Sequence, residues 1–154
     1  MKNKTQKNIR LCCYVALAFC IIYAIVMAVH FIGLLNGVND IDWAQHHARK
    51  IGFFIIYVLS SFLMIGMWIK VVINILRGIK ENSVFPQSNV RLLFWLALVF
   101  FVYILCWTNH VVLYQDNFVF EFQANNIIMP FFLLFFAFMY KVAADAVEEN
   151  NLTI

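Results

Sequence analysis

The sequence predicts an all-α fold, a transmembrane four-helix bundle with both termini on the same side of the membrane. Four long stretches carry no charged residue: 11–39, 51–69, 92–115 and 122–140. Each has roughly 19 residues or more, enough for a helix to cross the hydrocarbon core of a bilayer. Hydrophobic residues make up 64% of the chain and charged residues 12%, whereas soluble domains carry about 25% charged residues. We therefore expect a single integral membrane domain over residues 1–154.

The positive charges gather at one end of the predicted bundle. Most of them precede the first span, flank the second connection or follow the fourth span: Lys2, Lys4, Lys7, Arg10, Lys70, Arg77, Lys80, Arg91 and Lys141. The opposite connections carry two basic residues and four acidic ones: Arg49, Lys50, Asp40, Asp42, Asp116 and Glu121. Because Lys and Arg near span ends favour the cytoplasm, this distribution predicts an N-in/C-in topology. The basic residues also predict contact with anionic lipid headgroups. Direct binding of nucleic acid would need a basic element away from the membrane, and we expect none from this sequence.

The first predicted span covers residues 9–35 and ends at Asn36, followed by Gly37 in a turn. Its apolar run is longer than the roughly 7–15 residues of a secretory signal, and three more spans follow, so we expect an uncleaved helix. The pair Gly33 and Gly37 matches a helix-packing pattern of membrane proteins. Because the pair overlaps the turn, a helix end is favoured over a dimer face.

The second predicted span, residues 51–79, is longer than the hydrocarbon core requires, so we expect tilt or a projection into the cytoplasm. Lys70, Asn74 and Arg77 recur at helical spacing and form one polar stripe near its cytoplasmic end. Two interpretations stay open. Lys70 extends its ammonium to the interface, or the stripe is a polar docking groove.

The remaining predicted elements are spans at residues 92–113 and 127–142, and a cytoplasmic helical extension and tail over residues 143–154. Pro86 suits the first turn of the third predicted helix, and Pro130 the first turn of the fourth. Backbone N–H groups in a first turn make no intrahelical hydrogen bond, so proline's missing N–H costs nothing there. We expect Asn150 and Asn151 to break the extension, which leaves an extended end over residues 152–154.

No catalytic motif is recognisable, and we expect neither enzymatic activity nor a cofactor. The histidines all fall in the outer half of the bundle or its outer loop: His30, His46, His47 and His110. A metal site or pH sensor is one hypothesis for them. Their spacing favours packing histidines instead, because sequence neighbours do not share a helix face and no paired cysteines support them. We therefore expect no metal.

Polar residues inside a membrane call for a functional hypothesis. The candidate intramembrane polar cluster consists of Lys70, Asn74, Thr108 and Asn109. If these side chains line one cavity, the protein handles a small solute or an ion. No span has a carboxylate near its centre, and no paired half-helix interruptions are present, so the sequence gives a transporter little support. A homo-oligomer stays open.

Two predicted cytoplasmic segments resemble a known family. Residues 76–85 (LRGIKENSVF) and 89–92 (NVRL) are similar to a signature in which a short gap precedes Phe and then Asn-Val-x-x-Leu. Residues 148–154 (EENNLTI) resemble an acidic box that ends in Leu-Thr-Ile or Leu-Thr-Val. With its four spans, the chain resembles a bacterial integral membrane family, domain of unknown function 2975. It departs from the family pattern at Gly78, which lies far from Phe85, and at Pro86, where Ser or Thr is common.

Members of that family have no established enzymatic activity, and their genes commonly neighbour a small helix-turn-helix regulator. The resemblance therefore implies a regulatory or adaptor protein of the bacterial cytoplasmic membrane that tethers or inhibits such a regulator. The candidate partner contacts are Phe85, Asn89, Arg91, Glu148, Glu149, Leu152 and Ile154. The two glutamates are suited to the basic DNA-reading face of a regulator, and the tail to strand addition or anchoring. The alternatives are a helix cap in the loop and a tail that folds back on the bundle.

Overall fold

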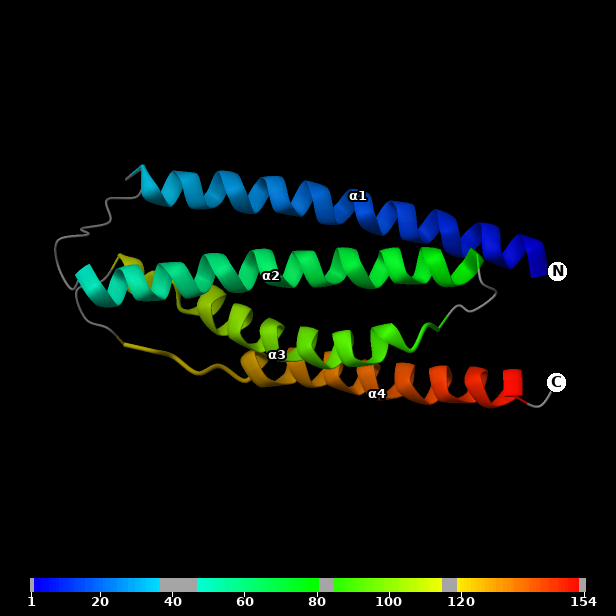
Figure 1. The fold of residues 1–154 in the computed structure, drawn as a ribbon. Coiled ribbons are helices and arrows are strands. Elements are labelled where there is room, and N and C mark those ends of the chain that lie inside the picture. The colour runs from blue at the N-terminus through cyan, green and yellow to red at the C-terminus, as the bar shows by residue number, and fades with distance from the viewer. Residues whose placement is uncertain (1, 37–46, 81–84, 115–118, 153–154) are drawn as a thin grey trace.

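The computed structural model describes residues 2–36, 47–80, 85–114 and 119–152 and confirms the all-α fold (Figure 1). Its elements are α1 (Lys2–Leu35), α2 (His47–Lys80), α3 (Ser88–Thr108), the 3₁₀ helix η1 (His110–Leu113) and α4 (Asn125–Leu152). The four α-helices are long and apolar enough to cross a membrane. The chain is accordingly a multi-pass membrane protein by helix length and composition.

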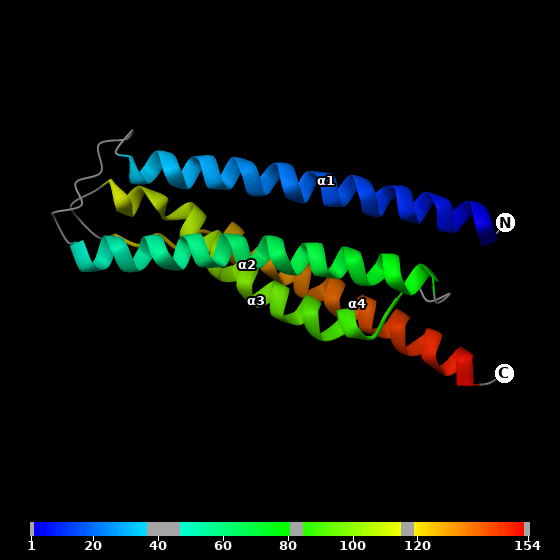
Figure 2. The ribbon, with the colours of Figure 1, turned by 45° about the horizontal axis from the view of Figure 1, so that its top comes forward.

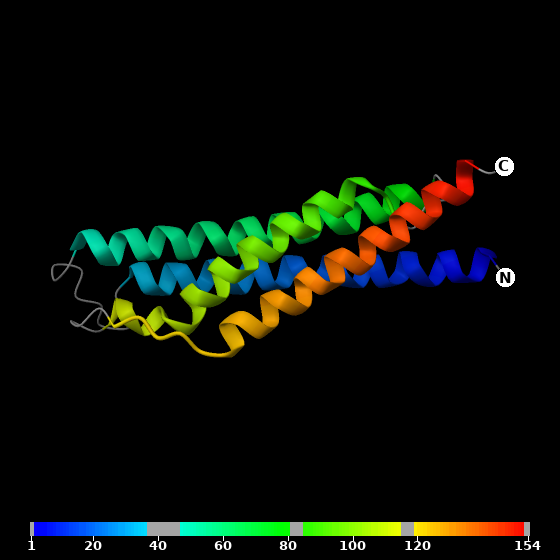
Figure 3. The ribbon, with the colours of Figure 1, turned by 90° about the horizontal axis from the view of Figure 1, so that it is seen from below.

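The helices lie side by side, and the two chain ends lie at the same end of the bundle (Figure 1). Each helix packs against its neighbour in sequence: α1 on α2, α2 on α3, and α3 on α4. Figures 2 and 3 show α3 and α4 running obliquely across the direction of α1 and α2. The short η1 packs against α2 and α3 at the end opposite the termini. Thus α2 and α3 form the middle of the bundle, and α1 and α4 its outer members.

Burial follows this arrangement. Tyr57 of α2 and Leu96 of α3 are fully buried, and α4 contributes Ala137 and Ala144 to the interior. Small residues let helix backbones approach closely, which is a main source of packing energy in lipid. By contrast, α1 and α4 expose many large apolar side chains, as expected of surfaces that face acyl chains: Leu11, Phe19, Ile22, Ile25, Val29, Ile32, Phe131, Phe132, Phe135 and Phe136.

The third and fourth helices differ from the sequence prediction. The span predicted at residues 92–113 is divided, because α3 ends at Thr108 and Asn109 has non-helical dihedrals (φ −105°, ψ 13°) before η1. In this segment two backbone N–H groups donate to the carbonyl three residues earlier, as in a 3₁₀ helix, and not to the one four residues earlier. Val112 N, for example, donates to Asn109 O at 3.0 Å.

The boundaries of α4 were also predicted wrongly. The helix begins at Asn125, so Pro130 lies in its second turn, and it continues through the two asparagines to Leu152. Pro86 lies two residues before α3, not in its first turn, and its carbonyl accepts a bond from Asn89 N at 3.0 Å. The predicted break at Asn150 fails because intrahelical bonding outweighs the weak helix propensity of Asn. Ile154 lies outside the described residues.

We predict that Ala137→Leu destabilises the bundle, because Ala137 is fully buried and extra methyl groups force packed helices apart. The expected loss in free energy of unfolding is about 1–3 kcal/mol. The measurement is unfolding of the purified protein in mixed micelles with increasing dodecyl sulfate. Ala146→Leu is the matched control, because the same substitution falls on an exposed position of α4. Equal unfolding midpoints for the two variants would contradict the observed packing of α4.

Candidate functional site

A buried amide links three helices at the end of the bundle that carries the termini. Asn89 of α3 is fully buried. Its Oδ1 accepts a hydrogen bond from Asn74 Nδ2 of α2 at 2.8 Å. Its Nδ2 donates to the backbone oxygen of Val71 at 3.0 Å and to the hydroxyl of Tyr140 on α4 at 3.3 Å. Because hydrocarbon offers polar groups no partners, such groups are stable only when satisfied inside the protein.

The segment before α3 is attached to α4 through Gln87. Its Nε2 donates to Asp145 Oδ1 at 2.8 Å and to Glu148 Oε2 at 3.0 Å. The ring of Phe85 packs edge-on against Tyr140 with centroids 5.4 Å apart. Gln87 occupies the N-cap position of α3 but makes no side-chain cap bond. Its amide therefore serves the contact between helices and not the start of its own helix.

The structure separates the predicted partner contacts into two groups. Phe85, Arg91, Glu148 and Glu149 are exposed. Leu152 is the last residue of α4, and Ile154 lies outside the described residues. Asn89 was assigned wrongly, because its side chain is buried among helices and cannot reach a partner. The sequence reasoning missed Gln87 and Tyr140, whose partners lie more than 50 residues away in the chain and follow no local pattern.

A second network closes the opposite end of the bundle. Asn109 Nδ2 donates to the backbone oxygens of Leu105 and Glu121, both at 2.9 Å. In return, the backbone N–H of Glu121 donates to Asn109 Oδ1 at 2.7 Å. The amide thus caps the end of α3 and also binds the chain segment that leads into α4. Asn126 of α4 adds a bond from its Nδ2 to Thr108 Oγ1 at 3.1 Å.

The four residues predicted to line one polar cavity therefore do not come together. Asn74 belongs to the network around Asn89, whereas Thr108 and Asn109 belong to the network at the other end. Lys70 is exposed on α2. The prediction failed because Asn74 lies near the end of α2 that is close to the chain termini, whereas Thr108 and Asn109 lie at the opposite end of the bundle.

Aromatic rings fill the interior between α1, α2 and α3. Tyr57 packs edge-on against Phe31 with centroids 4.9 Å apart and against His30 at 6.2 Å. The hydroxyls of Tyr23 and Tyr103 are hydrogen-bonded to each other, which joins α1 to α3. Within the part of the chain that the structure describes, His30 Nε2 and the Tyr57 hydroxyl have no hydrogen-bond partner. These rings hold α1 against the middle of the bundle.

The histidines do not assemble a metal site in the described part of the chain. His30 packs among aromatic rings, and Nδ1 of His110 lies 2.7 Å from the backbone oxygen of Trp107. His46 lies outside the described residues, and His47 begins α2. Within the described residues, no group of three or more His, Cys, Asp or Glu side chains is placed to hold a metal ion.

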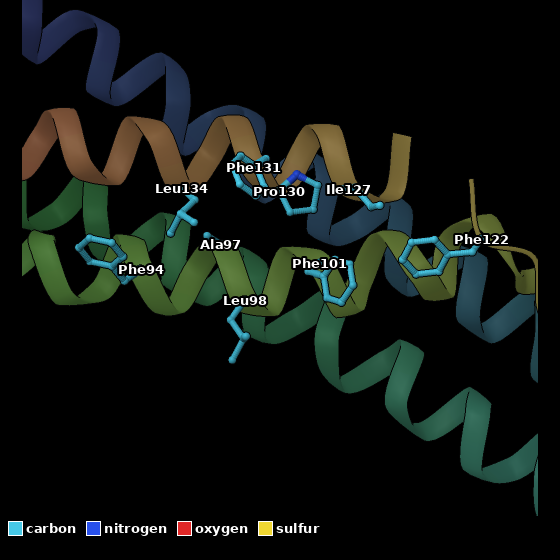
Figure 4. Close-up of a pocket in the computed structure, with 9 residues that line it drawn as sticks. All are labelled: Phe94, Ala97, Leu98, Phe101, Phe122, Ile127, Pro130, Phe131 and Leu134. Atoms are coloured by element: carbon cyan, nitrogen blue, oxygen red, sulfur yellow. The ribbon is translucent and has the colours of Figure 1, made fainter. Parts of the chain in front are cut away.

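Two hollows along the helices are apolar. Figure 4 shows one of about 450 Å³ between α3 and α4, and its lining residues are Phe94, Ala97, Leu98, Phe101, Phe122, Ile127, Pro130, Phe131 and Leu134. A second, of about 400 Å³, lies beside Phe85 and Tyr140 between α2 and α4. In a bilayer, such surfaces accommodate acyl chains.

No family model, curated protein or solved structure matches this chain. The resemblance to a four-span membrane family therefore stays a prediction from the two segments that carry it.

We predict that Asn89→Leu lowers the free energy of unfolding by about 1–3 kcal/mol, because the partners of a buried amide are left without it. The pair Asn89→Leu and Asn74→Leu should show a coupling energy of about 0.5–1.7 kcal/mol in a double-mutant cycle. Unfolding in mixed micelles gives both quantities. Asn8→Leu is the matched control, since the same substitution there falls on an exposed position of α1. Additive single effects at Asn74 and Asn89 would show that their bond contributes nothing.

Proposed function

We propose that this protein is a non-enzymatic adaptor of the bacterial cytoplasmic membrane that tethers or inhibits a small helix-turn-helix regulator. The observation that carries the proposal is the contact of Gln87 with Asp145 and Glu148. Through it, the described residues that border the first family-like segment lie beside Glu148, the first residue of the second, at one end of the bundle.

The charges of this end suit such a partner. The end of α4 presents Glu148 and Glu149, both exposed, on a helix that continues to Leu152. A regulator reads DNA with a basic face, and an acidic surface complements that face and competes with phosphates. Phe85 is 37% exposed beside this surface and offers an apolar contact to the same partner. A partner held here is kept from DNA.

The proposal places the termini in the cytoplasm. The basic side chains toward that end are exposed, and they include Lys4, Lys7, Arg10, Arg77, Lys80 and Arg91. Their number relative to the opposite end supports the N-in orientation. They also supply contacts to anionic headgroups, at about 1 kcal/mol for each charge.

The rival function, handling of a small solute or an ion through a polar cavity inside the bundle, has less support. It requires Lys70, Asn74, Thr108 and Asn109 to converge, and they lie in separate places. The hollow between α3 and α4 and the one beside Phe85 are apolar.

We predict that Glu148→Lys lowers recovery of the partner by about tenfold or more, because a repulsive charge replaces an attractive one in the proposed contact. The measurement is affinity capture of the tagged protein from native membranes in mild detergent, followed by quantitative mass spectrometry. Glu121→Lys is the matched control, since it makes the same change in net charge at an exposed position of the opposite end.

A basic DNA-binding protein captured by the wild type and the control, but not by Glu148→Lys, would support the proposal. Equal capture by both variants would show that the acidic surface takes no part in binding the partner. If wild-type membranes yield no DNA-binding protein, the adaptor function fails, and solute flux in proteoliposomes becomes the next measurement.

The orientation has its own test. Alkaline phosphatase, which is active only outside the cytoplasm, should be inactive when fused after the full chain and active when fused after Tyr114, which follows the third span. Green fluorescent protein at the same two positions should give the opposite pattern, because it folds in the cytoplasm. Active phosphatase on the full chain would reverse the proposed topology and place the Gln87 contact on the wrong side for a cytoplasmic partner.

A further inference from the structure

The two outer helices each leave one long face without a protein neighbour. Among the described residues, the backbone of α1 lies close to that of α2 alone, and the backbone of α4 to that of α3 alone. In Figure 1, α1 and α4 lie at the upper and lower edges of the molecule. In the most apolar stretch of each helix, 11% of α1 and 17% of α4 are buried, against 33% of α2 and 28% of α3. The outer faces of α1 and α4 therefore meet either lipid or another protein.

The outer face of α1 ends in positive charge. Positions seven residues apart lie about two turns apart on one side of a helix. One such series on α1 is exposed throughout, and its members are Lys4, Leu11, Ala18, Ile25 and Ile32. Lys7 is exposed one turn from Lys4, at the end of the bundle that carries the termini. An aliphatic stripe along α1 thus continues into two cations.

The outer face of α4 ends in negative charge. Its series at the same spacing is also exposed throughout, and its members are Ile128, Phe135, Val142 and Glu149. Glu148, which is bonded to Gln87, lies outside this series. The charged ends of both faces lie at the end of the bundle that carries the termini. The cations of α1 and the carboxylate of α4 therefore lie on the same side of the membrane.

The apolar parts of the two faces differ in shape. A hollow of about 450 Å³ lies along α4 alone, and its lining residues are Ile127, Ile128, Phe131, Phe132 and Phe135. The face of α1 carries smaller side chains, with Ala18 at its centre and Ile25 and Ile32 toward the end opposite the termini. Large rings on one helix and small aliphatic groups on the other are suited to close packing.

The charges distinguish a protein neighbour from lipid. An anionic membrane surface attracts Lys4 and Lys7, but it repels Glu149. A second copy of the chain offers each face the opposite charge at the same depth, because the cations belong to α1 and the carboxylate to α4. Electrostatic complementarity of this kind fixes which surfaces meet.

We propose that a second copy of this chain covers these faces, with α1 of one copy packed antiparallel against α4 of its neighbour. Lys4 and Lys7 lie beside the neighbour's Glu149, and aliphatic side chains of α1 enter the hollow on α4. Close packing and polar contacts are what hold helices together in lipid. Each copy carries one face of each kind, so the contact closes either reciprocally between two copies or around a ring.

The test is disulfide cross-linking between two differently tagged chains, reconstituted together in phosphatidylcholine vesicles at a high ratio of lipid to protein. Both chains lose their native thiols through four substitutions: Cys12→Ser, Cys13→Ala, Cys20→Ala and Cys106→Ala. One chain then receives Ile22→Cys on α1, and the other Phe135→Cys on α4. Oxidation with copper phenanthroline should join the two tags about threefold more than when Leu63→Cys on α2 replaces Phe135→Cys. All three positions are exposed, so these cysteines should leave the fold intact.

Charge reversal tests whether the charged ends select the neighbour. Glu149→Lys in the chain with the α4 cysteine should lower the cross-linking yield about threefold, because like charges then meet. Lys4→Glu with Lys7→Glu in the other chain should lower it similarly. The reversals combined should restore the yield, which a damaged fold would not do. Glu121→Lys, at an exposed position of the opposite end, is the matched control and should change nothing.

Two results would overturn the proposal. Equal yields with Phe135→Cys and Leu63→Cys would show random collision and leave both faces to lipid. A yield that no charge reversal changes would show that the charged ends do not pair, and the choice of a second copy as the neighbour would fail with it. The purified chains contain no regulator, so neither result bears on the adaptor function.

Discussion

The structure depends on the requirement that polar groups inside a bilayer find partners within the protein. Asn89 shows the requirement most clearly, because one side chain satisfies itself with a side chain and a backbone oxygen of α2 and with a hydroxyl of α4. An apolar residue at this position would pack against any apolar helix surface and would not specify which helices become neighbours. The amide specifies the neighbours of α3, and the loop before α3 then falls within reach of α4.

The two ends of the bundle use the same chemistry for different results. At the end with the termini, amides join helices, and the carboxylates of Glu148 and Glu149 are exposed on α4. At the other end, the Asn109 amide binds the backbone of the connecting segment. The middle of the bundle is aromatic and aliphatic. The hydrogen-bonded amides of Asn89 and Asn109 thus lie toward opposite ends of the bundle.

Much of the fold could be predicted from the sequence, and less of the site. The four charge-free stretches predicted the four helices correctly, because the length of a span and its lack of charge can be read from the local sequence. The break at Asn109 could not be predicted, because Asn109 leaves the helix to bind the backbone of Glu121, twelve residues away. The burial of Asn89 could not be predicted, because it depends on which helices face its side chain. The exposure of Glu148 was easier to predict, since an unpaired charged side chain is rarely buried.

The order in which the helices pack has a consequence for how the protein is made. Each helix lies against the one before it in the chain, so most contacts join segments that are close in sequence. Proteins dominated by such contacts fold quickly, because little chain entropy is lost before a contact forms. During insertion, α2 can dock on α1 as soon as both are in the bilayer, and α3 and α4 can follow in turn. Two polar groups wait for a later helix: the Tyr23 hydroxyl of α1 requires Tyr103 of α3, and Asn89 requires Tyr140 of α4.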